Sequence, residues 1–156
     1  MPELSKSNTS ESPFLSAFFG TAIVQRHFDG FLEDSLKSFD LTRADFDTLY
    51  FLRFRLSKSA VTLSELSSTF NISPGSASER VNRLLGNKLV SRRVNPHRRN
   101  TISVRITPKG IETVDNILLS LTALCDDFLG RVFEPKELDC YLKLNSKLIA
   151  FIKETP

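Results

Sequence analysis

The residues with the clearest chemical capacity are the basic side chains of residues 71–110. This segment holds nine lysines and arginines and a single acidic residue, Glu79, so its formal charge is +8. The rest of the 156-residue chain holds twelve basic and seventeen acidic residues, which leaves −5. A basic segment in an otherwise acidic chain predicts a polyanionic partner, and the alternative is a charged loop that is only solvated. The basic residues are Arg80, Arg83, Lys88, Arg92, Arg93, Arg98, Arg99, Arg105 and Lys109.

Other side chains that commonly do chemistry are isolated along the chain. Cys125 falls in an apolar stripe, Cys140 has no basic neighbour in sequence, and His27 and His97 have no metal-ligand spacing around them. There is no glycine-rich phosphate loop, nucleophile elbow or paired acid motif. We therefore expect a protein that is not an enzyme and that carries no cofactor and no metal.

The composition is that of a globular protein, with 40% hydrophobic and 25% charged residues. No apolar run approaches the roughly 18 residues of a membrane span. Residues 1–12 are polar and serine-rich and lack the pattern of a signal peptide, so we expect a disordered tail there. These features predict a soluble, cytoplasmic protein without a membrane partner.

Periodicity and capping residues predict a mainly α fold with a small β wing. Thr42 with Asp45 and Thr62 with Glu65 have the spacing of capping boxes, and Asn71 tolerates the left-handed backbone of a tight turn. The predicted helices are 13–39, 42–56, 63–70, 74–87, 107–130 and one that begins at residue 134, with a hairpin over 89–106.

Two short helices joined by a three-residue turn form a helix-turn-helix, and a basic two-stranded hairpin after them makes a winged helix. The helix that follows carries apolar residues at alternating spacings of three and four, the a/d pattern of a coiled coil. That seam either packs within one subunit or meets its counterpart across a twofold axis. It comprises Ile111, Val114, Leu118, Leu121, Cys125 and Phe128.

On three segments the chain resembles the MarR (multiple-antibiotic-resistance-regulator) family of bacterial transcription factors. They are LSELSSTFNISPGSASERVNRLL at 63–85, LVSRRVNP at 89–96 and ISVRITPKG at 102–110. The resemblance implies one domain over 13–153, with a winged helix-turn-helix at about 42–107 and dimerisation helices at about 13–39 and 108–153. It also implies a homodimeric regulator, more often a repressor, that binds a pseudo-palindromic double-stranded DNA operator and is released by a small effector or an oxidant.

The second helix of the helix-turn-helix is expected in the major groove and the wing arginines in the minor groove. Short hydroxyls near the start of that helix suit phosphates or base edges, while Ser73 is equally suited to be only a cap and Arg83 only an internal ion-pair partner. The expected DNA-binding residues are Ser73, Pro74, Gly75, Ser76, Ser78, Glu79, Arg80, Asn82, Arg83, Arg98 and Arg99.

The resemblance also implies a dimer interface and an effector pocket. The interface would use the first and last helices together with the seam, through Phe14, Leu118, Leu121, Cys125, Leu148 and Ile152. The pocket would lie between the helical base and the winged lobe and suit an aromatic or lipophilic acid. Its candidate residues are Phe19, His27, Phe46, Tyr50 and Arg53, although core packing is the alternative for the aromatic ones.

The chain departs from the family pattern in three respects. The peroxide-sensing branch of the family carries its reactive cysteine near the start of the first helix, whereas no cysteine precedes Cys125 here. Lys88 stands where the family usually has glycine, and we expect Asn87 to take over the left-handed helix end. The wing tip reads Arg98, Arg99, Asn100 instead of Asp-Arg-Arg. Two alternatives to an effector-released repressor stay open, namely a regulator that senses oxidants through a thiol and a winged-helix module that binds proteins without reading DNA.

Overall fold

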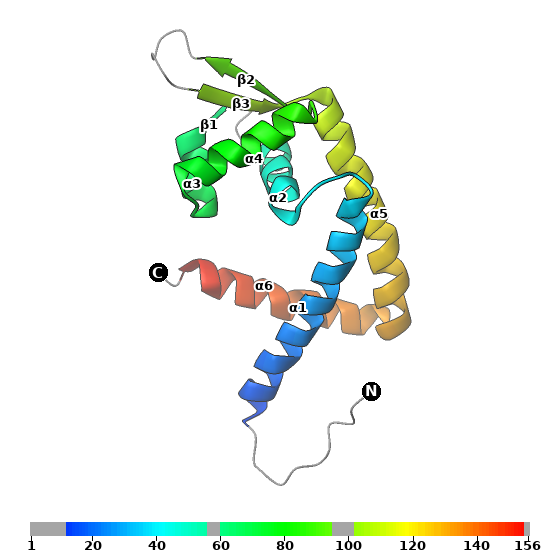
Figure 1. The fold of residues 1–156 in the computed structure, drawn as a ribbon. Coiled ribbons are helices and arrows are strands. Elements are labelled where there is room, and N and C mark those ends of the chain that lie inside the picture. The colour runs from blue at the N-terminus through cyan, green and yellow to red at the C-terminus, as the bar shows by residue number, and fades with distance from the viewer. Residues whose placement is uncertain (1–11, 56–59, 95–101, 155–156) are drawn as a thin grey trace.

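The computed structural model describes residues 12–55, 60–94 and 102–154 and divides them into a winged lobe and a base of long helices (Figure 1). The expected mainly α fold with a β wing is confirmed. The predicted tail and the wing tip, including Arg98 and Arg99, lie outside the described residues. The elements in chain order are α1 Pro13–Lys37, α2 Arg43–Phe54, β1 Val61–Thr62, α3 Leu63–Phe70, α4 Pro74–Gly86, β2 Val90–Val94, β3 Ile102–Ile106, α5 Pro108–Val132 and α6 Pro135–Glu154.

Local capping sets where most of these helices begin. Thr42 and Asp45 form the predicted reciprocal capping box at the start of α2. At the start of α3, the Thr62 hydroxyl accepts from the amide of Glu65, but the Glu65 carboxylate accepts instead from Nη2 of Arg55 at 2.9 Å. The predicted second capping box is therefore only half formed, because an arginine from the previous helix competes for the glutamate.

The winged lobe packs α2, α3 and α4 against a three-stranded antiparallel sheet in the order β1-β3-β2. The two-residue strand β1, which pairs Val61 with Val104, is not predicted by the sequence pattern. Both of these valines are fully buried, as are Leu49 and Leu84. The short strand thus closes the sheet over the core on which α4 rests.

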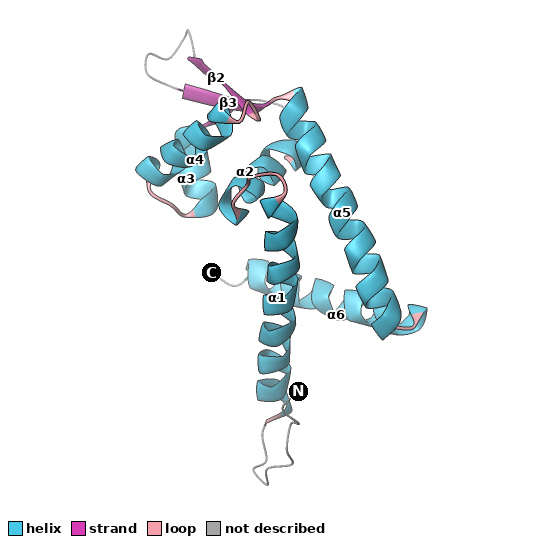
Figure 2. Cartoon of the chain, turned by 45° about the vertical axis from the view of Figure 1, so that its right-hand side comes forward, coloured by secondary structure: helices cyan, strands magenta, loops and turns pink. Residues whose placement is uncertain are grey.

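The base is built from α1 and α5, which run side by side, and from α6, which turns back across α1 (Figures 1 and 2). Phe128 of α5 packs edge-on against Phe28 and Phe31 of α1, with ring centroids 5.7 Å apart in each pair. Only Leu36 of α1 is buried, and no described residue of α6 is buried. The helices of the base therefore leave much apolar surface uncovered within one chain.

The a/d seam on α5 is used largely inside the chain. Val114 is fully buried, Leu118 and Leu121 are half-buried against the core, and Phe128 packs on α1. Cys125 is half-buried and free, and the free Cys140 on α6 is exposed. A second role of the seam across a twofold axis stays a proposal.

Three helices end in Schellman motifs whose left-handed residue is not glycine. These residues are Asp40, Asn71 and Lys88, with φ of 53°, 49° and 61°. At the end of α4 the amides of Lys88 and Leu89 donate to the carbonyls of Leu85 and Leu84 at 3.0 and 2.9 Å. Asn71 fills the role predicted for it.

The expectation that Asn87 takes the left-handed position was wrong. Asn87 is right-handed, with φ of −79°, and the next residue, Lys88, is left-handed. The reason is that the amide of Leu89 donates to the carbonyl of Leu84 while the Leu89 side chain is buried in the core, where it is 3% exposed. This requirement places the turn one residue later than the more tolerant asparagine.

Lys88→Gly should therefore stabilise the fold. A residue with a Cβ in the left-handed region costs the folded state about 1–2 kcal/mol. Glycine removes this cost, but its greater freedom in the unfolded chain offsets roughly 0.5–1 kcal/mol of the gain. We expect a gain of about 0.5–1 kcal/mol in the free energy of unfolding, measured by urea denaturation. Asn87→Gly is the matched control and should destabilise the protein, and a stabilising effect of both changes would contradict this account.

Candidate nucleic-acid interface

Helix α4 presents its first turns to solvent on the outer side of the winged lobe (Figure 1). The side chain of Ser73 caps the helix by accepting from the amide of Ser76 at 3.1 Å, and Pro74 occupies the first turn. Ala77, Val81 and Leu84 face the core. The opposite face carries the predicted contact residues, all exposed apart from the half-buried Ser78: Ser73, Pro74, Gly75, Ser76, Ser78, Glu79 and Asn82.

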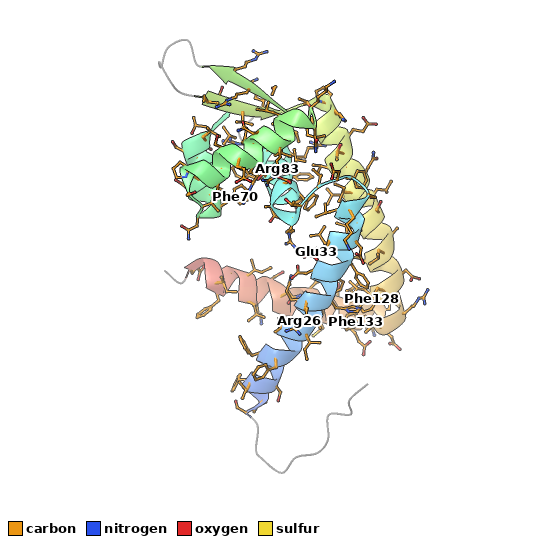
Figure 3. The ribbon with its side chains drawn as sticks, viewed as in Figure 1. Arg26, Glu33, Phe70, Arg83, Phe128 and Phe133 are labelled. Atoms are coloured by element: carbon orange, nitrogen blue, oxygen red, sulfur yellow. The ribbon has the colours of Figure 1, made fainter. Side chains whose placement is uncertain are left out.

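Arg83 is held by ion pairs within the lobe. Its Nη2 and Nε donate to the carboxylate of Asp45 at 3.1 and 3.4 Å, and its Nη1 donates to Glu79 at 3.1 Å. The hydrogen bond to Asp45 raises the pKa of the guanidinium above its ordinary value. Arg83 lies on α4 (Figure 3) and forms the internal ion pair with Asp45, while a contact of its half-exposed side chain with DNA stays a proposal.

Asp45 has a larger role than the capping that the sequence indicated. Its side chain is 5% exposed and accepts from the backbone and hydroxyl of Thr42 as well as from Arg83. A buried carboxylate needs such partners, because an unpaired charge in the interior is costly. Asp45 therefore ties the start of α2 to α4 and fixes the tilt at which α4 is presented.

The side chain of Arg80 is half-buried at the edge of the winged lobe. Its Nη1 donates to the hydroxyl of Thr48, which is fully buried, at 3.3 Å, and its guanidinium carbon lies 5.2 Å from the ring centre of Phe70. Stacking on an aromatic ring restricts the guanidinium without neutralising its charge. The Arg80 side chain thus extends from α4 to the C-terminal end of α3, and no acidic residue among those described forms an ion pair with it.

Basic side chains continue from α4 onto the wing. Arg92, Arg93 and Arg105 are exposed on β2 and β3, and Ser91 pairs with Arg105 across the hairpin. Lys109, at the start of α5, donates to the backbone carbonyl of Asn87 at 3.1 Å. Among the described residues of 71–110, the positive charge is therefore gathered around α4, the strands of the wing and the start of α5.

The five residues expected to form an effector pocket are spread over different surroundings in the single chain, although Phe46 and Tyr50 are neighbours with ring centroids 5.9 Å apart. Phe46 is 6% exposed in the core, and Arg53 is ion-paired with Asp115 at 3.2 Å. His27 lines a cavity of about 410 Å³ between α1 and Phe128, whereas Tyr50 lines a separate cavity on α2, and Phe19 packs edge-on against its neighbour Phe18.

Two residues expected at a dimer interface do meet. Phe14 of α1 and Leu148 of α6 line one open groove of about 520 Å³, together with Phe18. Leu118 and Leu121 lie apart from this groove, against the core of their own chain. Ile152 is 69% exposed on α6.

The described residues hold no cluster of three histidine, cysteine or acidic side chains arranged to bind a metal. Within the same ranges, no helix combines the length and apolar character that a membrane crossing requires.

Comparison with known proteins gives one family. The sequence model of the MarR family matches residues 39–99, from the end of α1 to the wing. No curated protein sequence matches the chain.

Solved structures share the fold at low sequence identity. Wild-type MarR from E. coli in its apo form is 21% identical, with a TM-score of 0.74 over 90% of this chain and 98% of that one. YusO from Bacillus subtilis is 17% identical, with a TM-score of 0.73 over 90% and 99%. MepR from S. aureus, in a complex with DNA, is 17% identical, with a TM-score of 0.64 over 85% and 95%.

Proposed function

We propose that this protein is a cytoplasmic transcriptional repressor of the MarR family. The MarR family model matches residues 39–99, and the fold is similar to that of MarR from E. coli over 90% of the chain. The protein binds a pseudo-palindromic operator in double-stranded DNA as a homodimer. A small effector releases it. The observation that carries the proposal is the exposed first half of α4 beside the basic strands of the wing.

The geometry of α4 suits the major groove. Its exposed N-terminal half offers hydroxyls, a carboxylate and an amide, which are groups that bond base edges or phosphates. Its inner face is held by the core, and the Asp45–Arg83 pair ties it to α2, so that DNA meets a rigid helix. The similar MepR structure in complex with DNA supports this assignment.

The homodimer is supported by apolar surface that one chain leaves uncovered. Phe14, Phe18 and Ile23 on α1 are 84%, 66% and 65% exposed. On α6, Leu148 and Ile152 are 55% and 69% exposed. Soluble monomers rarely expose contiguous apolar patches of this kind, and a second copy of the same two helices would cover them.

The experiment is selection of operator sequences from a random duplex library, followed by footprinting on the selected DNA. We expect protection of two half-sites about one helical turn apart, which is the spacing that a dimer with two linked lobes requires. Failure to enrich any sequence, with DNA binding that is weak and independent of salt, would favour a winged-helix module that binds proteins.

Alanine substitutions of two arginines, with one lysine as a control, then separate contacts to bases from contacts to phosphates. Arg80→Ala should lower affinity for the selected operator by about 1–3 kcal/mol and for random DNA by less. Arg105→Ala should weaken both DNAs alike and reduce the salt slope by about one. Lys143→Ala on α6 is the control and should change neither affinity. Equal losses of Arg80→Ala on both DNAs would assign Arg80 to phosphate.

A further inference from the structure

The outer face of α4 carries an acidic side chain at its centre. Because successive residues of a helix lie about 100° apart, Glu79 projects away from Ala77 and Val81, which face the core. The Glu79 side chain is 75% exposed. Gly75, about one turn earlier, and Gly86, about two turns later, lie on the same side of the helix and are exposed. Glu79 therefore stands clear of its neighbours along this face and can reach base edges in a groove that receives α4.

The Glu79 carboxylate is held in place from the interior of the lobe. Nη1 of Arg83 donates to Oε1 of Glu79 at 3.1 Å, and Nη2 of the same guanidinium donates to the carboxylate of Asp45 at 3.1 Å. Asp45 is 5% exposed and also accepts from the hydroxyl of Thr42. Hydrogen bonds thus connect the start of α2 to the exposed carboxylate and restrict its position. Among the described residues, no group donates to the other oxygen of Glu79, Oε2.

The charges around Glu79 make it a poor partner for phosphate. Asp45 and Glu79 share the positive charge of Arg83, so these three groups together carry one net negative charge. An ionised carboxylate accepts hydrogen bonds and donates none, and the phosphate oxygens of DNA repel it. A partner for Oε2 in the major groove must therefore be a donor on a base edge.

The base edges of the major groove offer a carboxylate few donors. Guanine presents acceptors at N7 and O6, and thymine presents an acceptor at O4. Adenine has a donor at N6, but the acceptor N7 beside it repels a carboxylate. Cytosine presents its N4 amino group with no acceptor beside it on the same base. Cytosine is therefore the base that an exposed and fixed carboxylate favours.

We propose that Glu79 is a specificity-determining residue that selects cytosine at one position of each operator half-site, by accepting a hydrogen bond from cytosine N4. Arg83 is its positioning residue, because it joins the exposed carboxylate to the buried Asp45. The proposal deepens the function proposed above and rests on it, since it names a base that the operator must contain.

The test starts from the operator selected from the random library. Each base pair of a half-site is replaced in turn by the other three, and the affinities of the wild type and of Glu79→Ala are compared. In the wild type we expect one position at which replacing C·G lowers the affinity about tenfold, the effect of one specific base contact. In Glu79→Ala the loss at this position should shrink to less than about twofold, while the preferences at the other positions remain.

The cytosine amino group is tested directly with 2-pyrimidinone, a base that keeps the cytosine ring and lacks the N4 amino group. Placed at the same position, it should weaken the wild type about tenfold and Glu79→Ala less than about twofold. Any effect on the duplex itself is common to both proteins. Glu79→Gln should shift the preference at this position from C·G to A·T, because an amide can bond N6 and N7 of adenine together.

Glu112→Ala is the matched control for the loss of a negative charge. Glu112 is exposed on α5, away from the outer face of α4. Its removal should leave every base preference unchanged and alter the affinity for all duplexes alike.

Arg83→Lys tests the positioning role. It keeps the positive charge and loses the fork that joins the two carboxylates, so the preference for cytosine should weaken at this position and remain at the others. Equal losses on operator and random DNA, with the cytosine preference intact, would contradict the positioning role. The comparisons with the Glu79 variants do not depend on how Arg83→Lys folds.

The inference is overturned if no position of the operator prefers C·G, or if the preference survives in Glu79→Ala. It is also overturned if Glu79→Ala binds all duplexes more tightly with unchanged preferences, because Glu79 would then act only by repulsion. A protein that enriches no operator contradicts the proposed function and this inference with it. The selection step shows that result before any variant is compared, so the two failures are distinguishable.

Discussion

Gly110→Ala should destabilise the protein by about 3 kcal/mol or more, because there is no room for a methyl group at this position. A Cβ built on Gly110 would lie 2.2 Å from the carbonyl oxygen of Leu89 and 2.8 Å from Cγ1 of Ile106. The Leu89 carbonyl cannot easily move, since it accepts from both the amide and the hydroxyl of Thr107 at 3.0 Å. The expected effect is a large fall in the urea midpoint of unfolding.

Gly130→Ala is the matched control on the same helix. A Cβ on Gly130 would meet nothing within 4 Å, so alanine should stabilise α5 by about 0.5–1 kcal/mol through its higher helix propensity. If Gly110→Ala lowers the free energy of unfolding and Gly130→Ala raises it, packing against Leu89 decides the outcome at residue 110. A Gly110→Ala protein as stable as the wild type would show that the start of α5 can move away from the wing.

Ile152→Asp should separate the proposed homodimer. Ile152 is 69% exposed in one chain, so the substitution removes little packing within that chain. In an interface formed by α1 and α6 it would bury an unpaired carboxylate, which costs several kcal/mol. We expect the dimer dissociation constant, measured by analytical ultracentrifugation, to rise by at least a hundredfold.

Ser146→Asp provides the control for added charge on the same helix. Ser146 is exposed on a more polar face of α6, near Lys143, and its substitution should leave the dimer unchanged. Operator affinity should fall in Ile152→Asp and not in Ser146→Asp, because both half-sites must be bound by linked lobes. An intact dimer in Ile152→Asp would place the interface elsewhere, with the seam of α5 as the next surface to test.

A substitution in the seam of α5 would not test dimerisation separately from folding. Leu121 belongs to the seam, but it is half-buried against the core of its own chain. A charge there would damage the fold and an interface together. The decisive substitution for dimerisation therefore lies on the exposed face of α6.

The sequence by itself determined the features that depend on near neighbours. Helix starts follow from the side chains that cap them, so Thr42, Ser73 and Thr107 could each be predicted within a residue or two. The turn of the helix-turn-helix follows from the tolerance of Asn71 for a left-handed backbone. The winged fold and the basic character of its outer face follow from the same local patterns.

The tertiary structure decided the features that depend on partners far along the chain. The pairing of Asp45 with Arg83, the stacking of Arg80 on Phe70 and the ion pair of Arg55 with Glu65 join residues from different parts of the chain. No spacing in the sequence encodes such pairings, because they depend on how α2, α3 and α4 cross. The left-handed Lys88 has the same origin: the need to bury Leu89 overrode the preference of Asn87.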